Sequence, residues 1–345
     1  MKCTIQNIAD HLGLSRNTVS KALKNSSEVS ENTRNLVIKT ASKLGYKNAT
    51  FATPVIPASE TDSNGTILFL TRTYASDSEF WTTVLRGIES ILSNANYHLA
   101  ISIMSDSDLK QLNFPQTISD SSIKGIILVE ICDKVVCDAL SQFNLPIVSV
   151  DMPNVPFEEL NGIDVVTMES KKNLKKIINQ LIEKGAESFG FVGDLYSPNV
   201  SRGFQERYNA LSECLAEHQL PLNQKNCLLH QTPEDFRNFQ TTVNNLQAMI
   251  SLPDVFICGN DWTAIQLIYA LQFLGFQIPK DICVVGFDNI PAASRISPSL
   301  TTISTPQKYL GIAAARQILE RIQHPNCPHV FCQYETELII RNSTN

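Results

Sequence analysis

The chain has 345 residues, of which 43% are hydrophobic and 18% are charged. This length exceeds one ordinary core and fits a small module joined to a large or two-lobed domain, and the composition is globular rather than disordered. No run approaches the roughly 18 apolar residues of a membrane span, and the first ten residues lack the apolar core of a signal peptide, so we expect a cytoplasmic protein.

The net charge of −6 hides an asymmetry along the chain. Residues 1–50 carry eight Lys or Arg and three Asp or Glu, whereas the remainder carries 20 and 31. A short basic segment on an acidic body indicates an anionic partner that binds at one end. A solvated basic face without a partner is the alternative.

The nine cysteines are scattered along the chain without a CxxC pair. Several stand within apolar runs such as VFICG and ICVVG. This usage is typical of small buried apolar residues in a reducing compartment.

The first predicted elements are three short helices within residues 4–46. An apolar stripe predicts the first helix, which Gly13 ends because glycine adopts a left-handed conformation easily. Ser15 is a good N-cap for the second helix. The third helix is predicted to begin at Ser30, to end at Gly45 and to bury four apolar residues: Leu36, Val37, Ala41 and Leu44.

The second helix presents the kinds of side chain that read DNA. Three short helices with a tight turn between the first two form a helix-turn-helix unit. On the outward face, Arg16 can donate two hydrogen bonds to guanine, and Asn17 can pair with adenine. Four neighbours could reach a base edge or the phosphates: Ser15, Thr18, Ser20 and Lys21. The pattern alone also fits a three-helix interaction module that binds no DNA.

The stretch from Thr4 to Tyr46 contains an LSxxTVSK core and a VSExTR segment. It resembles the DNA-binding headpiece of the LacI/GalR family of transcriptional regulators over nearly its whole length. The resemblance implies that Arg16, Asn17 and Lys21 occupy the positions at which the family contacts bases. We therefore take residues 1–46 as a helix-turn-helix DNA-binding domain.

Residues 47–64 depart from the family pattern. The family places a hinge helix here, which usually opens with Pro-Asn and carries a leucine that enters the minor groove. This segment has Pro54 and Pro57 and no leucine, and prolines at those sites break a helix. We expect a linker, with Phe51 or Ile56 as candidates to replace the leucine.

From Gly65 onward, apolar runs alternate with amphipathic segments. Seven runs have the near-continuous apolar character of buried parallel strands, at residues 66–71, 98–104, 125–130, 146–151, 188–194, 255–261 and 281–288. Helical patterns lie between them, at residues 79–95, 169–185, 204–218 and 262–275. Alternating strands and helices predict an α/β body of doubly wound parallel sheets, and residues 65–345 are enough for two such lobes.

Polar residues follow several of these strands, and ligands bind beyond the carboxyl ends of strands in open α/β sheets. The candidates are residues 71–74, Asp151, Asp194, Asn260 with Asp261, and Asp288 with Asn289. Carboxylates and amides facing a cleft suit a hydroxyl-rich ligand, because each can engage two adjacent hydroxyls. Three aromatic residues beside these ends could cover a sugar face: Phe80, Trp81 and Trp262. Taken singly, each candidate could equally be a strand-end cap or a surface ring.

Residues 251–303 are similar to the effector domain of the same family, with its ND pair, PxD turn, VVGFD strand and PxLTT segment. Residues 145–151, 206–220 and 337–344 match further family segments. The resemblance implies a two-lobed fold like that of the periplasmic binding proteins. With Thr73, Phe80 and Trp81, the effector-binding set that we expect contains the residues implied by the family: Asp151, Arg207, Asn260, Trp262 and Asp288. Glu169-Ser170 and Asn173-Leu174 replace family Asp-Asn and Gly-Ala pairs, which leaves the effector's identity open.

Other chemistry has little support. The sequence shows no P-loop, HExxH, GxSxG or GxGxxG motif after a strand, and we expect no cofactor. The segment 324–332 contains two His and two Cys in no known zinc spacing, so we expect a loop rather than a metal site. The basic run Lys171, Lys172, Lys175 and Lys176 is expected to be a solvated helix face rather than a second nucleic-acid contact.

The sequence therefore predicts a sequence-specific DNA-binding regulator, expected to be a repressor and not an enzyme. A small polar effector, expected to be a sugar, controls its affinity for a palindromic operator. We expect a homodimer that places two recognition helices in successive major grooves. The alternatives are a soluble small-molecule-binding protein without gene control, and an enzyme with Asp151 or Asp288 as general base, for which no partnered nucleophile is evident.

Overall fold

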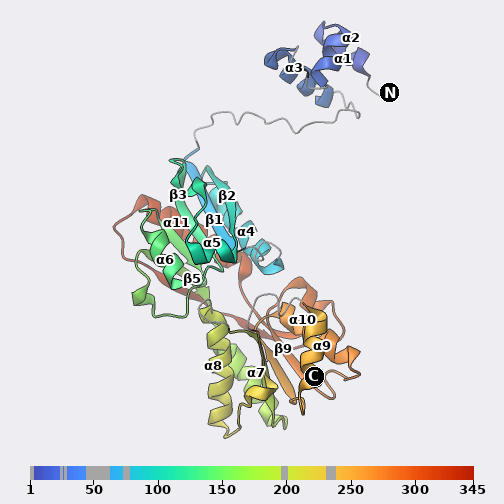
Figure 1. The fold of residues 1–345 in the computed structure, drawn as a ribbon, viewed down its shortest axis with the longest axis vertical. Helices are drawn as coiled ribbons and strands as arrows, with labels where there is room; N and C mark the ends of the chain where they lie inside the picture. The colour runs from blue at the N-terminus through green and yellow to red at the C-terminus, as the bar shows by residue number, and fades with distance from the viewer. Residues whose placement is uncertain are drawn as a thin grey trace. The chain divides into compact units, whose positions relative to one another are not determined.

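The computed structural model of the protein describes residues 4–23, 26, 29–43, 63–72, 78–195, 201–230 and 238–345. The chain divides into two compact units, Met1–Thr61 and Asp62–Asn345 (Figure 1). Phe51, Ile56 and nearly all of the predicted linker lie outside the described residues. None of the described helices has the length and apolar character needed to cross a membrane.

The first unit, called the headpiece below, contains the three predicted helices. They are α1 (Ile5–Leu12), α2 (Arg16–Leu23) and α3 (Glu31–Lys43). Thr4 and Asn7 form a reciprocal capping box at the start of α1. Gly13 ends α1 with φ 64°, a left-handed conformation that glycine adopts without a steric penalty. The predicted turn between α1 and α2 is confirmed.

A small apolar core holds the three helices together. Its buried members are Ile8, Ala9, Val19, Ala22, Val29, Val37 and Ala41. Leu14, in the turn, packs against this core. Leu36 is 50% exposed, so its predicted burial is wrong. Leu44 and Gly45 lie outside the described residues.

The second unit, called the body below, contains two six-stranded sheets, one in each lobe. The first sheet has the order β11-β5-β4-β3-β1-β2 and the second β12-β10-β9-β8-β6-β7. The strands are β1 (Gly65–Arg72), β2 (Tyr97–Met104), β3 (Ile123–Val129), β4 (Ile147–Val150), β5 (Ile163–Met168), β6 (Phe189–Asp194), β7 (Leu228–His230), β8 (Val255–Cys258), β9 (Cys283–Asp288), β10 (Thr301–Ser304), β11 (Phe331–Tyr334) and β12 (Glu337–Ile339). Only β12 pairs antiparallel among these strands, so the predicted parallel sheets are confirmed.

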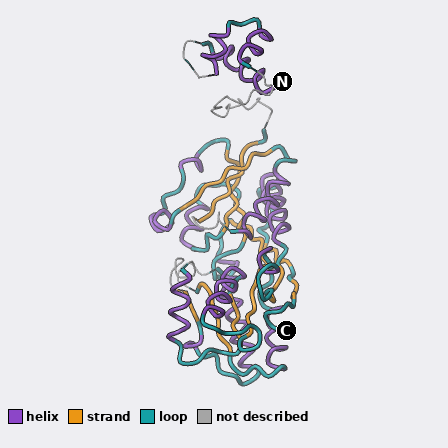
Figure 2. Tube along the Cα trace, turned by 90° about the vertical axis from the view of Figure 1, so that its right-hand side faces the viewer, coloured by secondary structure: helices purple, strands orange, loops and turns teal. Residues whose placement is uncertain are grey.

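Helices flank the sheets of both lobes, as Figure 2 shows. In the first lobe they are α4 (Glu79–Leu92), α5 (Asp106–Gln111), α6 (Lys134–Ser141) and α11 (Gln307–Gln323). In the second lobe they are α7 (Lys172–Glu183), α8 (Arg202–Glu217), α9 (Phe239–Ala248) and α10 (Asp261–Phe273).

Strand alternation explains why the first sheet is covered on both faces. Ile67 and Phe69 of β1 belong to a core with residues of α4 and α11. Leu68 and Leu70 belong to a different core with residues of α5 and α6. Because successive side chains of a strand point to opposite faces, a continuous apolar run requires cover on both sides.

Three short crossings connect the lobes, after β5, after β10 and after β11. The last of these places β11 at the edge of the first sheet and β12 at the edge of the second. The crossings are tied together, because the Glu169 amide donates to the Tyr334 carbonyl at 2.8 Å. The Asn173 side chain also donates to the Thr336 carbonyl at 2.7 Å. The crossings after β5 and β11 are therefore joined by hydrogen bonds. The three crossings together are called the hinge below.

After the β10 crossing, α11 packs closely along α4. A Cβ atom at Gly87 would stand 2.2 Å from the Lys308 carbonyl oxygen, and one at Gly311 would stand 2.0 Å from the Val84 carbonyl oxygen. Two glycines therefore let the helix backbones meet. This contact fixes α11 to the first lobe although β10 belongs to the second.

Candidate functional site

The exposed face of α2 carries the predicted DNA-contacting residues. The Ser15 hydroxyl accepts a hydrogen bond from the Thr18 amide at 3.0 Å, which confirms it as the N-cap. Arg16 and Asn17 are exposed, whereas Thr18, Ser20 and Lys21 are half-buried. Val19 and Ala22 point into the core. The helix thus buries its apolar side and leaves the guanidinium and carboxamide groups accessible.

In the body, three acidic residues stand at strand ends in left-handed backbone conformations. Glu130 follows β3 with φ 56°, Asp151 follows β4 with φ 72°, and Asp288 ends β9 with φ 119°. Such conformations are unfavourable for residues other than glycine and gather at functional sites. The first two residues belong to one lobe and Asp288 to the other.

Arg207 of α8 is 3% exposed and interacts electrostatically with two of these carboxylates, Asp288 and Asp151. Its guanidinium donates to the Gly259 carbonyl at 2.7 Å and stacks on the Phe287 ring at 3.6 Å from the centroid. Burial lowers the pKa of Arg207, while the charges of Asp288 and Asp151 oppose that shift. The arginine therefore joins carboxylates of both lobes in one electrostatic cluster.

Burial dominates the protonation behaviour of the carboxylates in this cluster. It raises the pKa of Asp288 well above its usual value, and the Arg207 charge opposes the shift. Burial also raises the pKa of Asp151, although the Met152 amide donates to its carboxylate at 2.8 Å. Next to Asp151 the lobes touch, because the Arg202 amide donates to the Met152 carbonyl at 2.9 Å.

Two aromatic residues lie next to Glu130. The Trp81 indole N–H donates to the Glu130 carboxylate at 2.5 Å, and the Phe80 ring meets the Trp81 ring edge-on at 4.7 Å between centroids. Burial raises the pKa of Glu130, against the effect of that hydrogen bond. Sequence reasoning missed Glu130 as a site residue. The signal was its place at the end of an apolar strand, where Asp151 and Asp288 also stand.

The residues around the start of α10 have mainly internal partners. The Asn260 side chain accepts from the Thr263 amide at 2.9 Å as the N-cap of α10. Trp262 follows it and is 41% exposed. Asp261 is fully buried, and its carboxylate accepts from the Thr302 hydroxyl and from the Ile290 amide. Burial raises its pKa to about 6. Asp261 thus stabilises the strand ends rather than facing the cleft.

Asn289 also has internal partners, because its side chain bonds to Arg341 at 2.7 Å and to Ser304 at 3.1 Å. Thr73 lies outside the described residues. The structure therefore brings Trp81, Asp151, Arg207 and Asp288 together with Glu130, whereas Asn260 and Trp262 remain predicted effector contacts at the edge of this set.

The basic run on α7 forms ion pairs within the body. Lys171 and Lys175 both pair with Glu213 of α8, at 3.0 and 2.8 Å, and Lys172 pairs with Glu335 at 3.1 Å. Lys172 and Lys176 are exposed, as predicted for a solvated helix face, whereas Lys171 and Lys175 are half-buried.

The predicted loop 324–332 is confirmed over residues 324–330, between α11 and β11, whereas Phe331 and Cys332 belong to β11. Its anchor is buried Asp164, which binds the Arg321 guanidinium at 2.8 Å and the Val330 amide at 2.8 Å. Within the described residues, no group of three or more His, Cys, Asp or Glu is placed to hold a metal ion.

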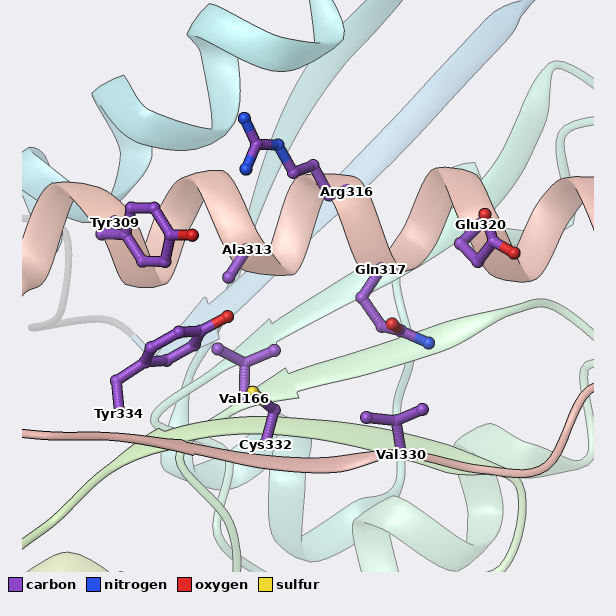
Figure 3. A pocket seen from close by; sticks show the side chains of 9 residues that line it. All are labelled: Val166, Tyr309, Ala313, Arg316, Gln317, Glu320, Val330, Cys332 and Tyr334. Carbon is purple, nitrogen blue, oxygen red and sulfur yellow. The ribbon is translucent and has the colours of Figure 1, made fainter.

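A pocket of about 260 Å³ lies apart from the acidic cluster, between α11 and the edge strand β11 (Figure 3). Its lining residues are Val166, Tyr309, Ala313, Arg316, Gln317, Glu320, Val330, Cys332 and Tyr334. The Tyr309 and Tyr334 rings meet edge-on at 5.1 Å between centroids. None of the predicted effector residues lines this pocket.

A helix-turn-helix unit joined to a two-lobed α/β body, with polar strand ends that meet between the lobes, is the architecture of ligand-responsive transcriptional regulators. Comparisons with known proteins agree. Residues 4–48 match the model of the bacterial regulatory proteins of the lacI family, and residues 178–344 match a periplasmic binding protein-like domain. The chain thus contains a DNA-binding domain of the lacI family and a periplasmic binding protein-like domain, which confirms the predicted resemblance and fold.

Full-length relatives support this assignment. The chain is 27% identical to the ribose operon repressor of Haemophilus influenzae over 344 residues, which cover 99% of this chain and 98% of the relative. It is 26% identical to the transcriptional repressor PurR of Photobacterium profundum over 345 residues, with coverage of 99% and 98%. The lac repressor dimer bound to operator and an anti-inducer has a similar fold, with a TM-score of 0.67, 19% identity and coverage of 100% and 99%.

Proposed function

We propose that the protein is a cytoplasmic, sequence-specific DNA-binding repressor whose operator affinity is controlled by a small polar effector bound between the lobes of the body. The observation that carries this proposal is the combination, in one chain, of the exposed Arg16 and Asn17 on α2 with the buried Arg207 among carboxylates of both lobes. The first arrangement suits base reading, and the second suits a ligand with many hydroxyls.

On the DNA side, α2 supplies the recognition helix, with Arg16 and Asn17 toward base edges. We infer that Ser15, Thr18, Ser20 and Lys21 contribute further base or phosphate contacts. A homodimer would place two such helices about one turn of B-DNA apart, roughly 34 Å, on a palindromic operator. The solved structure of the lac repressor, which has a similar fold, is a dimer bound to operator, and it supports a dimeric assembly for this chain.

On the effector side, Asp151, Arg207 and Asp288 are the proposed polar contacts, and Phe80 and Trp81 the apolar wall. Asn260, Trp262 and Thr73 complete the set. A sugar fits best, because carboxylates and a guanidinium bind vicinal hydroxyls and aromatic rings cover the apolar sugar face. One relative is named as the repressor of a ribose operon, which supports a sugar as the ligand class.

Asp288 links the cluster to the hinge. Its backbone carbonyl accepts from the Gln307 side chain at 2.7 Å and from the Thr305 hydroxyl at 3.2 Å. Thr305 lies in the crossing after β10, and Gln307 is the first residue of α11. A ligand that engages the Asp288 carboxylate thus acts on the segment about which the lobes turn. It shifts the population of lobe arrangements by its difference in affinity for them, and thereby shifts operator affinity.

The test is selection of duplexes from a random DNA pool by the full chain, followed by titration of the selected site with and without sugars. We expect a palindromic consensus and a sugar that changes operator affinity by about 5-fold to 150-fold. Salt-sensitive binding that is equal for every duplex would contradict the regulator and leave a small-molecule-binding protein without gene control.

A further inference from the structure

Two deeply buried side chains have polar atoms without an internal partner. Arg207 of α8 is 3% exposed, and Ser170, which lies between β5 and α7, is 1% exposed. Within the part of the chain that the structure describes, the Arg207 Nε and the Ser170 Oγ have no hydrogen-bond partner. Native proteins rarely leave such buried groups unpaired, which indicates a partner from outside the chain.

The two side chains border the same small space. A Cβ atom at Gly203, in the first turn of α8, would stand 3.4 Å from the Arg207 Nη2, 3.6 Å from the Ser170 Oγ and 3.8 Å from the Arg207 Cζ. Apart from neighbouring helix backbone, these are its three nearest heavy atoms. The two polar atoms therefore lie at most about 7 Å apart, little more than two hydrogen-bond lengths. One oxygen atom has the right size to bridge them across this space, called the Gly203 gap below.

Local structure explains why the Ser170 hydroxyl is unused. A serine before a helix often accepts a hydrogen bond from an amide of the first turn. At the start of α7 the Glu169 carboxylate takes that role, because it accepts from the Lys171 and Lys172 amides at 2.6 and 2.8 Å. Ser170 therefore has no capping function, and it lies in the crossing after β5, which is part of the hinge.

The guanidinium of Arg207 is held in place but only partly paired. Its Nη1 donates to the Gly259 carbonyl at 2.7 Å, and the group stacks on the Phe287 ring at 3.6 Å from the centroid. The bond from Nη1 is the only hydrogen bond of this guanidinium to the described residues. The edge formed by Nε and Nη2 can therefore still donate, from a fixed orientation.

We propose that Gly203, Ser170 and Arg207 form a subsite for one hydroxyl group of the effector, with Gly203 as the residue that limits its size. The ligand oxygen accepts from the Arg207 edge, and its proton is donated to the Ser170 Oγ. An ammonium group does not suit this place, because it would face the positive guanidinium. A carboxylate gains little, because the charges of Asp288 and Asp151 already act on Arg207.

The subsite would connect ligand binding to the hinge. Arg207 and Gly203 belong to α8 of the second lobe, whereas Ser170 belongs to the crossing after β5. A hydroxyl that bonds to both side chains holds this helix against that crossing. The inference rests on the proposed function, because it adds two residues and a defined ligand group to the same effector site.

The experiment uses calorimetric titrations of the full chain at pH 7 with six aldoses: D-glucose, D-galactose, D-mannose, D-xylose, L-arabinose and D-ribose. The aldose that binds most tightly is then titrated into two variants. Ser170→Ala should weaken binding about fivefold to tenfold, because one hydrogen bond is lost. Gly203→Ala should weaken binding about tenfold or more, because its methyl group fills the Gly203 gap. Ser107→Ala, at an exposed position on α5, is the matched control and should leave the affinity unchanged.

The melting temperature without ligand separates this role from a structural one. Ser170→Ala removes a buried hydroxyl that has no partner, and Gly203→Ala adds a methyl group at ordinary contact distances within a helix. Both variants should therefore melt at the wild-type temperature or roughly 1 to 3 °C higher, although both bind the aldose more weakly. A lower melting temperature together with weaker binding would assign both residues to the fold alone and overturn the inference.

Monodeoxy analogues of the same aldose identify the hydroxyl that enters the subsite. One analogue should bind the wild type about tenfold more weakly than the parent does. The same analogue should bind Ser170→Ala nearly as tightly as the parent does, because both changes remove the same hydrogen bond. If every analogue loses the same factor in both proteins, the Ser170 contact is wrong. If both variants keep the wild-type affinity, the Gly203 gap holds water only, and the inference is overturned.

Failure of this inference and failure of the proposed function give different results. No binding of any of the six aldoses, or tighter binding of D-glucuronate than of D-glucose, overturns the hydroxyl assignment. Operator titrations are then read separately, because any small molecule that changes operator affinity still supports the regulator. If the chain selects no duplex, the regulator fails even where an aldose occupies the subsite.

Discussion

The headpiece and the acidic cluster position their working side chains in opposite ways. In the headpiece, Arg16 and Asn17 stand exposed on a short helix that Ser15 caps, and the core lies on the other side of that helix. In the body, Arg207 and Asp288 are buried where two sheets end, and each affects the protonation of the other.

This difference has a physical consequence for mutation. An exposed side chain on a capped helix can be exchanged with little effect on folding, so its loss is felt in binding alone. A buried carboxylate within a coupled cluster affects ligand affinity, the protonation of its neighbours and the stability of the fold at the same time. The headpiece should therefore respond residue by residue, and the cluster as a unit.

The largest effect is expected for Asp288→Asn, which would sharpen the comparison. Asparagine tolerates the left-handed backbone at this position, and the hydrogen bonds to Gln307 and Thr305 use the backbone carbonyl and not the side chain. We expect effector affinity to fall about a hundredfold, or about 3 kcal/mol, while operator affinity without effector stays unchanged. The melting temperature of the free protein at pH 8 should rise by a few degrees, because a buried charge is removed. If this variant still responds to the effector, Asp288 is not part of the effector site.

Arg16→Ala is the matching change in the headpiece. It should cost about 1 to 3 kcal/mol on the cognate operator and relax the preference at one base pair. Effector binding by the body and the melting temperature should match the wild type, because Arg16 is exposed. The measurement is fluorescence anisotropy with the selected operator and with each single-base variant of one half-site. An unchanged base preference would show that Arg16 does not contact a base.

The same contrast explains what the sequence could predict about the fold. The helix ends in the headpiece follow from local chemistry, as the capping by Thr4 and Ser15 and the turn at Gly13 show. The seven long apolar runs of the body were equally easy to recognise as strands. Five strands were not among the predicted runs. The strands β7, β10, β11 and β12 have only three or four residues, which carry too little periodicity, and β5, with six residues, was also missed.

Site prediction was limited by the same lack of tertiary information. Asp151 and Asp288 were found because they end apolar strands, but Asp261, also at a strand end, is buried among hydrogen bonds from Thr302 and Ile290. Sequence position alone does not distinguish a carboxylate that faces a cleft from one whose hydrogen bonds hold neighbouring strand ends in place. Glu130 ends an apolar strand in the same way, so its position was a usable signal, but its hydrogen bond from Trp81 is a tertiary contact that the sequence does not show.

The cluster should also give the body a distinctive dependence on pH. Burial raises the pKa of Asp261 to about 6, and it raises the pKa values of Glu130, Asp151 and Asp288. These folded-state pKa values lie above the unfolded-state pKa values of about 4. At a pH between the two, the folded protein therefore binds more protons than the unfolded protein. Their contribution to stability is fully present below about pH 4 and is lost as pH rises through the folded-state values, which for Asp261 means between about 4 and 6.

Both tryptophans, Trp81 and Trp262, belong to the body, so tryptophan fluorescence in urea measures its unfolding in the full chain. The free energy of unfolding should fall between pH 4.5 and 6.5, by at most about 1.4 kcal/mol per pH unit for each group. Burial is the largest single effect on the pKa of Asp164 and raises it, but hydrogen bonds from Arg321, Val330 and Gln317 together with the Arg321 charge outweigh burial and lower the pKa. Asp164 therefore does not interfere, because its contribution changes below about pH 4. Asp288→Asn should flatten the slope. A free energy that rises over this interval would contradict the cluster's protonation.

The smallest effect is expected for Ser15→Ala. This variant also tests whether a change in the headpiece stays confined to the headpiece. The change removes the acceptor for the Thr18 amide and should destabilise the start of α2 by about 1 kcal/mol. Hydrogen exchange should accelerate about fivefold in peptides that cover α2 and stay unchanged in the body.

Ser15→Asp separates the two roles assigned to this serine. Aspartate is an equally good N-cap, so it should restore the slow exchange of α2. Its negative charge would face the DNA phosphates, however, and should weaken operator binding in a salt-dependent manner. If Ser15→Asp binds the operator as tightly as the wild type, the serine acts only through the fold of α2, and its proposed contact with DNA is lost while those of Arg16 and Asn17 are untouched.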